Sequence, residues 1–421
     1  MNSALKIVRV IPYPYPAVQF GGPVLQSHAV CCELARRGHQ VKVVTSDMGI
    51  ADDVPRECWV EQSGYQVWHM KSTWFSRQPP YLLRGANRPL SEALRDADIL
   101  QLNVGLTLLN DSARFWAQRE QVPYVYNAEG ALCSKRMKIK YLRKLAFRHW
   151  VEQGIVLQAA ACQAVSQYEA ETLRSWHVPA EKIHVIPNGI VLPEPAAVAE
   201  RQTARAHFGY GDDECVFLFL GRLDRLKGVD LLLDAFRRLA GDHPSARLLI
   251  AGPDFGWEAN LRRDVAAAKL EHQVQFAGTL HDQAKRQAFR AADVFALNSH
   301  SEGLPNAVIE GLGYGLPMVL SPDCNLPEVA DFDAGLITPL DVSQIEIALR
   351  RMATDDVERS EFSRNARRLA AERFEIRTVV DQLELLYRHV IEQAAMCGDL
   401  PIKSSATDAG TKVNASCSVS D

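Results

Sequence analysis

The 421-residue sequence predicts an α/β fold composed of two doubly wound domains, each built around a parallel sheet. Short apolar runs alternate with helical patterns through both halves of the chain, and this alternation is interrupted once, from Pro187 to about Glu214. The length agrees with two domains, because a chain of this size exceeds what one hydrophobic core usually organises.

Seven strands are expected in the first half. The helix after the first strand should end at Gly38, because glycine is the usual residue just beyond a helix C-terminus. Ser166 and Glu169 have the spacing of a capping box and should begin another helix. The expected strands are Ile7–Ile11, Val41–Thr45, Tyr65–Met70, Ile99–Leu102, Pro123–Asn127, Ala161–Val165 and Ile183–Ile186.

The interruption is rich in proline, glycine and small polar residues, which is typical of an interdomain linker. We therefore predict an N-terminal domain over 1–188, a linker over 189–214 and a C-terminal domain over 215–375. A closing helix is expected over 376–395, and a disordered tail rich in Ser, Thr, Ala and Asp over 396–421. The strands expected in the second domain are Cys215–Leu220, Ala246–Ala251, Val274–Ala277, Val294–Leu297 and Met318–Leu320.

The composition excludes several classes of protein. Hydrophobic residues make up 47% of the chain and charged residues 23%, as in soluble globular proteins, and the net charge of −4 argues against nucleic-acid binding. The sequence has neither the ~20-residue apolar stretch of a membrane span nor the features of a secretory signal. Nine cysteines without a C-x-x-C pair indicate neither a disulfide framework nor a zinc site, so we expect reduced, buried thiols in a cytoplasmic protein.

Chemistry is expected at the carboxyl ends of the strands, where doubly wound sheets bind ligands near helix N-termini. The first candidate segment follows the apolar strand Cys215–Leu220. Gly221 allows a close backbone turn, and Arg222 and Lys227 supply positive charges of the kind that stabilise a leaving diphosphate. An exposed basic loop is the alternative interpretation.

The second candidate segment begins at Glu302 and ends at Glu310. Pro305 suits the first turn of a helix, so the free amides of Asn306 and Ala307 would face an anion. Two carboxylates beside a diphosphate are unfavourable unless they accept hydrogen bonds from sugar or ribose hydroxyls. The alternative is a pair of ordinary surface glutamates, which the neighbouring glycines and proline disfavour.

A third candidate is the Gly21-Gly22 pair after the first strand. Paired glycines let the backbone approach a phosphate or a sugar, although such a pair is also common in turns.

Together these motifs resemble the retaining glycosyltransferases of the GT-B fold, in the group 1 family also called family 4. The resemblance extends from about Lys6 to Tyr387 and implies two Rossmann-like domains that face each other across a cleft. The motifs that carry it are Gly21-Gly22, Gly38-His39-Gln40-Val41, Pro187-Asn188-Gly189, Gly221-Arg222, Lys227-Gly228, the Glu302/Glu310 pair and Gly315-Leu316-Pro317.

The resemblance implies a role for each matching position. Arg222 and Lys227 would neutralise the donor diphosphate in place of a metal ion, and Glu302 would lie against the donor sugar. No cofactor or metal is expected, and the donor would be a nucleotide sugar, UDP- or GDP-linked. The expected donor-binding residues, in which Glu310 holds the ribose, are Gly21, Gly22, Gly221, Gly303, Leu304, Pro305, Asn306, Ala307 and Glu310.

The chain departs from the family pattern at one position. Many members carry a histidine after the strand equivalent to Pro123–Asn127, and here Glu129 stands in its place. A carboxylate could still accept hydrogen bonds from a sugar hydroxyl or an acceptor, but it could not act as a cationic donor. Glu129 is therefore a candidate catalytic residue, with a helix-capping or surface role as the alternative.

A basic stretch with interleaved apolar residues follows, and it predicts an amphipathic helix. Such a helix could contact an anionic membrane surface or simply present a solvated face, and both interpretations stay open. The membrane-contact candidates are Lys135, Arg136, Lys138, Lys140, Arg143 and Lys144.

The sequence thus favours a cytoplasmic hexosyltransferase, with peripheral contact at the inner face of the membrane as an open hypothesis. It would move a hexose-type sugar to a hydroxyl of a glycan or lipid-linked acceptor, in cell-surface polysaccharide or glycolipid synthesis. Two alternatives remain: a sugar-nucleotide epimerase of the same fold, and a non-catalytic nucleotide-sugar-binding protein. The sequence leaves the nucleotide base, the sugar, the acceptor and the linkage undetermined.

Overall fold

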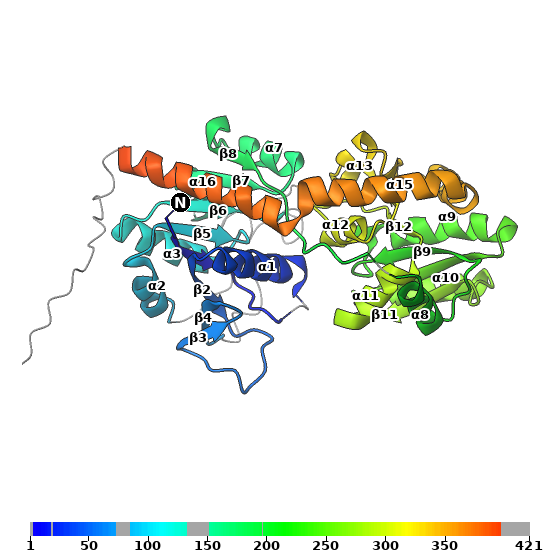
Figure 1. Ribbon diagram of the computed structural model, residues 1–421, viewed down its shortest axis with the longest axis horizontal. Helices are drawn as coiled ribbons and strands as arrows, with labels where there is room; N and C mark the ends of the chain where they lie inside the picture. Colours follow the sequence, from blue (N-terminus) through cyan, green and yellow to red (C-terminus); the bar gives the residue numbers. More distant parts are fainter. Residues whose placement is uncertain (1–2, 18–19, 73–84, 133–150, 196, 397–421) are drawn as a thin grey trace, which may run out of the picture.

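The computed structural model of the chain describes residues 3–17, 20–72, 85–132, 151–195 and 197–396. Figure 1 shows two α/β halves side by side, each with its own sheet. The first sheet has the strand order β3-β4-β2-β1-β5-β6-β7-β8, and the second has the order β11-β10-β9-β12-β13-β14. The strands of both sheets pair in parallel apart from β3 with β4. The predicted doubly wound architecture is confirmed.

The seven strands expected in the first domain are present. Their bounds are β1 Lys6–Val10, β2 Gln40–Ser46, β4 Tyr65–Met70, β5 Ile99–Asn103, β6 Tyr124–Asn127, β7 Ala161–Ala164 and β8 Ile183–Val185. One strand was not predicted: β3, Trp59–Gln62, which pairs antiparallel with β4 at the edge of the sheet. None of its four residues is fully buried, so it lacks the apolar run that marks the central strands.

The helices of the first domain are α1 Gly22–Arg36, α2 Asn87–Leu94, α3 Leu108–Arg119, α6 Gln153–Gln158 and α7 Gln167–Ser175. As predicted, α1 ends just before Gly38, whose φ of 90° suits glycine. The predicted start of α7 is also confirmed, because the Ser166 hydroxyl accepts a hydrogen bond from the Glu169 amide at 3.3 Å.

The second domain contains the five expected strands and one more. Their bounds are β9 Cys215–Leu220, β10 Ala246–Ala251, β11 Val274–Gly278, β12 Val294–Leu297, β13 Met318–Leu320 and β14 Gly335–Ile337. The three-residue β14 was missed because it begins at Gly335, and glycine is unfavourable within strands. The helices from α9 onward are α9 Val229–Asp242, α10 Glu258–Ala267, α11 Asp282–Ala291, α12 Asn306–Gly313, α13 Glu328–Asp331, α14 Val342–Thr354, α15 Asp356–Leu369 and α16 Ile376–Met396.

The predicted linker over 189–214 is not entirely irregular, because it contains helix α8, Val198–Phe208. This helix packs on α11, and its Arg205, 2% exposed, forms an ion pair with Asp293 at 3.1 Å. Few large apolar residues mark α8, since a buried arginine anchors it in place of a leucine. The later part of the predicted linker therefore packs as part of the second domain.

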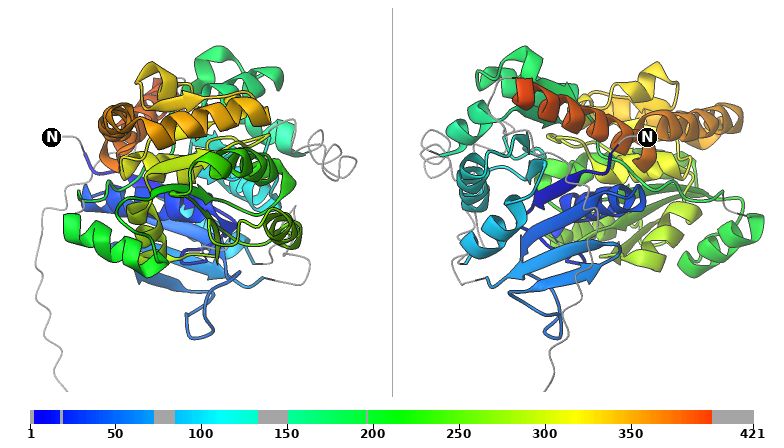
Figure 2. Two further views of the ribbon diagram at one scale, coloured as in Figure 1. Left: turned by 90° about the vertical axis from the view of Figure 1, so that its right-hand side faces the viewer. Right: turned by 60° about the vertical axis from the view of Figure 1, so that its left-hand side comes forward.

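The chain passes between the domains twice, and the two crossings are hydrogen-bonded to each other. The Ile190 amide donates to the Phe374 carbonyl, and the Ile376 amide donates to the Ile190 carbonyl, both at 2.7 Å. After the second crossing α16 returns to the first domain, where its apolar face joins the core beneath β1, β2 and β5 (Figure 1). In the right-hand view of Figure 2, α15 and α16 run along one side of the molecule across both domains.

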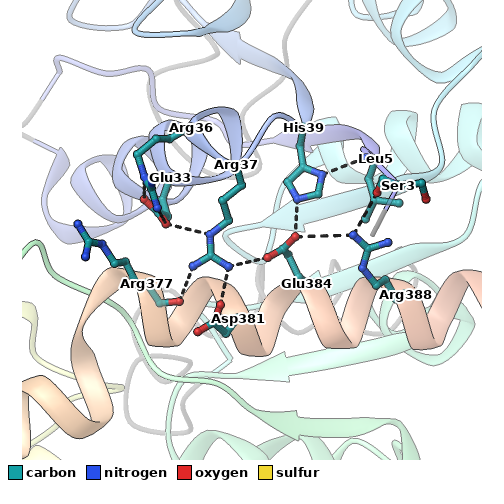
Figure 3. Close-up of polar contacts among 10 residues, drawn as sticks. All are labelled: Ser3, Leu5, Glu33, Arg36, Arg37, His39, Arg377, Asp381, Glu384 and Arg388. Carbon is teal, nitrogen blue, oxygen red and sulfur yellow. Dashed lines mark hydrogen bonds and ion pairs between the residues drawn. The ribbon is translucent and has the colours of Figure 1, made fainter. Parts of the chain in front are cut away.

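Charged residues fasten α16 to the first domain (Figure 3). Arg37, just after α1, donates to Asp381 and Glu384 at 2.5 Å each. His39 accepts from the Leu5 amide through Nδ1 at 3.0 Å, so its Nε2 carries the proton and donates to Glu384 at 2.5 Å. The Gly38-His39 motif therefore connects β1, α1 and α16.

Two expectations from composition can be compared with the structure. The six cysteines that the structure describes are free, but Cys58 is exposed and Cys32 is half-buried, so the expectation of uniformly buried thiols is wrong at these two positions. Among the described residues no helix has the length and apolar character needed to cross a membrane. The predicted disordered tail, beyond Met396, lies outside the described residues.

Candidate functional site

Both sheets reverse their strand order at one point, between β1 and β5 in the first and between β9 and β12 in the second. In open α/β sheets, ligands bind outside the carboxyl ends of the strands at such reversals. Gly221 and Arg222 directly follow β9, and residues 298–302 follow β12. Two of the predicted site segments therefore lie at this point of the second sheet.

The loops that follow β9 and β12 are bonded to each other. The Leu226 carbonyl accepts hydrogen bonds from the Ser299 hydroxyl at 2.9 Å and from the His300 amide at 2.7 Å. Gly228 has a φ of 62°, and a Cβ at this position would lie 1.9 Å from the Asn298 carbonyl oxygen. A glycine is therefore required after Lys227, and the close packing fixes the path of the loop.

Lys227 and Glu302 form an ion pair at the centre of these loops. Lys227 Nζ lies 2.5 Å from Glu302 Oε1, and the two side chains are 14% and 3% exposed. The backbone of Glu302 is held on both sides, because its amide donates to Asp323 at 3.0 Å and its carbonyl accepts from Asn325 Nδ2 at 2.6 Å. A fixed ammonium and a fixed carboxylate thus lie side by side. The ammonium could bind a phosphate, and the carboxylate could accept a hydrogen bond from an adjacent sugar hydroxyl.

Arg222 points elsewhere in this structure. Its guanidinium pairs with Asp224 at 3.0 Å and lies over the Phe255 ring, with 5.1 Å between Cζ and the ring centroid. The side chain is 42% exposed, and Nε is buried without a hydrogen-bond partner among the described residues. The structure therefore brings Lys227 and Glu302 together and directs Arg222 toward Asp224.

Helix α12 presents its N-terminus between the domains. Pro305 precedes the first turn as the N-cap residue, one position earlier than predicted, and Asn306 and Ala307 begin the helix. Asn306 Oδ1 accepts from Asn188 Nδ2 at 2.8 Å, and a Cβ on Gly22 would lie 1.6 Å from Asn306 Nδ2. The glycine pair of the first domain therefore lies against α12, and Gly21, exposed with a φ of 91°, is the N-cap of α1.

Glu310, on the same helix, is paired with Lys285 of α11, and both side chains are partly exposed. Sequence reasoning missed Lys285, because no motif surrounds it. Gly303 and Leu304, which precede α12, are buried. Among the described residues, no group of three or more His, Cys, Asp or Glu side chains is arranged to hold a metal ion.

Glu129 lies in a tight turn after β6, with a φ of 49°, and its amide donates to Asn127 Oδ1 at 3.1 Å. Its Oε2 is buried without a hydrogen-bond partner in the described structure. Burial raises the pKa of Glu129 to about 8, against the lowering effect of the Arg9 charge and with a further rise from Glu169. The residue is thus neither a helix cap nor a freely solvated side chain.

Arg9 is the charge that faces Glu129, and sequence reasoning missed it. It lies in β1, 3% exposed, and donates to Tyr387 Oη at 3.0 Å and to Asn103 Oδ1 at 3.1 Å. Tyr387, on α16, donates in turn to Gln101 at 2.9 Å. The indication was available, because Arg9 is the one charged residue in the apolar run from Ile7 to Ile11.

Two family models match the chain, one in each domain. Residues 21–189 match the glycosyl transferase 4-like domain, and residues 200–369 match the glycosyl transferases group 1. The chain belongs to the group 1 glycosyl transferases. This group 1 chain carries the matched regions on either side of the first crossing between its domains.

Curated relatives of this group 1 chain share part of its length. The D-inositol 3-phosphate glycosyltransferase of Mycobacteroides abscessus is 31% identical over 234 residues, which cover 53% of the chain and 52% of the relative. The mannosylfructose-phosphate synthase of Agrobacterium fabrum is 36% identical over 148 residues, which cover 33% and 32%. The chain thus spans about half or less of the length of these two relatives.

Solved structures resemble this group 1 chain over nearly its whole length. Anabaena HepE in complex with UDP and glucose superposes with a TM-score of 0.74 at 19% identity, covering 91% of the chain and 99% of HepE. The sucrose-phosphate synthase of Thermosynechococcus elongatus gives 0.72 at 21% identity, covering 92% and 99%. At these identities the likeness establishes the fold, which is GT-B.

Proposed function

We propose that this protein is a metal-independent, retaining glycosyltransferase that moves a hexose-type sugar from a nucleotide sugar to a hydroxyl of a glycan or lipid-linked acceptor. The observation that carries the proposal is the Lys227–Glu302 pair, fixed by the loops after β9 and β12. Family membership and the similar structures of HepE, which were solved in complex with UDP, glucose or UDP-glucose, support a nucleotide-sugar donor and favour uridine as its base.

In the proposed reaction the diphosphate of the donor lies against Lys227, and Arg222 turns from Asp224 toward it. The acceptor oxygen forms a bond to the anomeric carbon on the face from which the diphosphate departs, and the acceptor proton passes to a diphosphate oxygen. Positive charge from the two side chains stabilises the leaving group as its negative charge grows. Glu302 accepts hydrogen bonds from the donor sugar, Glu310 from the ribose.

Glu129 is assigned to the first-domain side of the cleft in this proposal. A carboxyl that keeps its proton near neutral pH donates a hydrogen bond to a sugar or acceptor oxygen, and after losing the proton it accepts one. The burial of its Oε2 and its position after β6, where relatives often carry histidine, support this assignment.

Thermal stabilisation by a panel of nucleotides tests the donor site directly. UDP, GDP, ADP and their common sugar conjugates are added with EDTA present, and a shift in melting temperature with one nucleotide class is expected. Lys227→Ala should remove the shift, while Lys269→Ala, in the turn after α10, should retain it. A folded protein that no nucleotide stabilises would contradict the proposal and favour a non-catalytic role.

Product analysis separates the proposal from its rivals. A transferase forms product only when an acceptor is present, and NMR should show that the anomeric configuration of the donor is retained. An epimerase would convert the donor alone, and a non-catalytic binding protein would bind the nucleotide sugar without turnover.

The membrane hypothesis rests on the sequence alone, since the basic stretch with Lys135, Arg136, Lys138, Lys140, Arg143 and Lys144 lies outside the described residues. We propose that this stretch binds the anionic inner face of a membrane while the enzyme works from the cytoplasm. Sedimentation with vesicles should show binding to anionic but not to neutral lipid. Equal binding to both, or to neither, would contradict the hypothesis.

A further inference from the structure

We propose that Ser166 and Glu169, at the start of α7, are positioning residues that hold the two sides of the active site in a fixed position relative to each other. The proposal rests on the function proposed above. It concerns two loops that face each other across the domains: the turn that contains Glu129 and Gly130, and the segment of Gly303 and Leu304 beside Glu302.

The Ser166 hydroxyl connects the two domains. It donates a hydrogen bond to the Gly303 carbonyl at 3.0 Å while accepting one from the Glu169 amide at 3.3 Å, and the residue is 5% exposed. Because the hydroxyl is engaged both as donor and as acceptor, its rotation is fixed. An N-cap residue of the first domain thus orients a backbone group of the second.

The Glu169 carboxylate holds the turn of the first domain. Its Oε1 accepts from the Gly130 amide at 2.6 Å and its Oε2 from the Val165 amide at 2.7 Å, and the residue is 3% exposed. Hydrogen bonds to an ionised carboxylate are short and stronger than neutral ones. Instead of closing a capping box on Ser166, the Glu169 side chain fixes Gly130, the neighbour of Glu129.

Packing confirms that the domains meet here. A Cβ on Gly303 would lie 3.0 Å from the Gly130 Cα, so the two backbones are in close contact. Val165, directly after β7, belongs to the hydrophobic cluster of the second domain together with Leu304. The end of β7 and the start of α7 therefore extend into the other domain at the site itself.

The consequence for the donor follows from peptide geometry. The peptide group is planar and trans, so fixing the Gly303 carbonyl also fixes the Leu304 amide, which points the opposite way. Leu304 is one of the expected donor-binding residues. Ser166 therefore acts on the donor through Gly303, and Glu169 acts on Glu129 through Gly130.

Hydrogen exchange and kinetics on the full chain test this inference. Ser166→Gly removes the hydroxyl, whereas glycine still begins a helix at little cost. We expect faster amide exchange at Gly130 and Leu304, roughly tenfold lower turnover from the lost hydrogen bond, and nearly unchanged affinity for the nucleotide. Ser166→Thr should restore turnover, because it keeps both functions of the hydroxyl.

Two further variants complete the design. Asp341→Gly removes the N-cap of α14, whose side chain accepts from Ser343 and Gln344, and should change neither exchange at the site nor turnover. Glu169→Gln should speed exchange at Gly130 or Val165, because an amide side chain keeps one acceptor oxygen.

The inference is overturned if Ser166→Gly leaves exchange and turnover unchanged, or if Ser166→Thr loses as much as Ser166→Gly. Failure of the proposed function looks different: the wild-type chain would then transfer no sugar, while the exchange comparison would still report on the contact between Ser166 and Gly303.

Discussion

The two sides of the cleft hold their charges in different ways. On the second-domain side, each charged residue of the predicted site has a partner of opposite sign: Lys227 with Glu302, Arg222 with Asp224, and Glu310 with Lys285. On the first-domain side, the buried Arg9 donates to the Asn103 amide and the Tyr387 phenol and forms no hydrogen bond with Glu129 among the described residues, although its charge acts on Glu129. Glu129 keeps a buried oxygen without a hydrogen-bond partner in that part of the chain.

This difference determines what each side can offer a ligand. Ion pairs keep their groups charged, so the second domain presents charges that can exchange partners when a diphosphate and hydroxyls arrive. Burial without a strong partner favours the neutral form, so the first domain presents a carboxyl that retains its proton near neutral pH. We therefore expect substitutions on the second-domain side to lower turnover, and substitutions on the first-domain side to change stability and its pH dependence.

The largest effect is expected for Lys227→Ala. Turnover should fall roughly a hundredfold or more, because losing one such donor typically costs ~3–4 kcal/mol of transition-state stabilisation. Stability should fall as well, by about 3–5 kcal/mol, since the buried Glu302 carboxylate would lose the ammonium with which it forms an ion pair. A double variant, Lys227→Met with Glu302→Gln, separates the two effects when its turnover and its unfolding by denaturant are both measured. This double variant should recover stability without activity, and recovery of both would contradict the role of Lys227.

Arg222→Ala should lose turnover by a similar factor, on the order of a hundredfold, but should keep its stability. Its side chain is 42% exposed and its pairing with Asp224 is local, so little folding energy depends on it. Arg225→Ala, an exposed position in the same loop, is the matched control for charge. Near-normal turnover of Arg222→Ala would show that Arg222 keeps facing Asp224 during the reaction.

On the first-domain side, Tyr387→Phe should lower the free energy of unfolding by about 1–3 kcal/mol, because Arg9 Nη1 and Gln101 Oε1 each lose a buried hydrogen bond to the Tyr387 hydroxyl. Leu385→Ala, 69% exposed on the same helix, should cost less than ~0.5 kcal/mol. Equal stability of the two variants, measured by denaturant unfolding, would mean that the buried network contributes nothing to attaching α16.

The last effect is of another kind, because it is the pH dependence of stability that Glu129 contributes. Its pKa is about 8 in the folded chain, above the ordinary 4.5, so the folded state binds the proton more tightly. Stability should therefore fall as pH rises from 4.5 through 8, by at most about 1.4 kcal/mol per pH unit for one proton. Glu129→Gln should flatten this decline in melting temperature. Part of the slope should persist, because burial also raises the pKa of Glu152 to about 7 despite the hydrogen bond from Tyr126.

An unchanged slope in Glu129→Gln would mean that Glu129 is ionised in the folded chain. The first-domain side would then resemble the second, with Arg9 as the ionic partner of Glu129.

The sequence by itself determined the strands of both sheets apart from β3 and β14, because buried parallel strands are continuous apolar runs that local reading detects. It also located the loops after β9 and β12, since glycines and charges directly after an apolar strand are typical of a ligand-binding loop in this kind of sheet. Elements with only a weak local pattern were not predicted, namely the edge strands β3 and β14 and the helix α8 inside the predicted linker. Pro305 was placed in the first turn of α12, one position too late.

Only the tertiary structure decided which charges meet. Arg9 and Tyr387 are separated by 378 positions in the chain, and Ser166 and Gly303 by 137. No periodicity or motif spans such sequence separations, because the partner of each side chain lies on another element and comes close to it only when the chain folds. The pairing of Lys227 with Glu302, the burial of the Glu129 Oε2 and the connection from α7 to the second domain all depend on contacts of this kind.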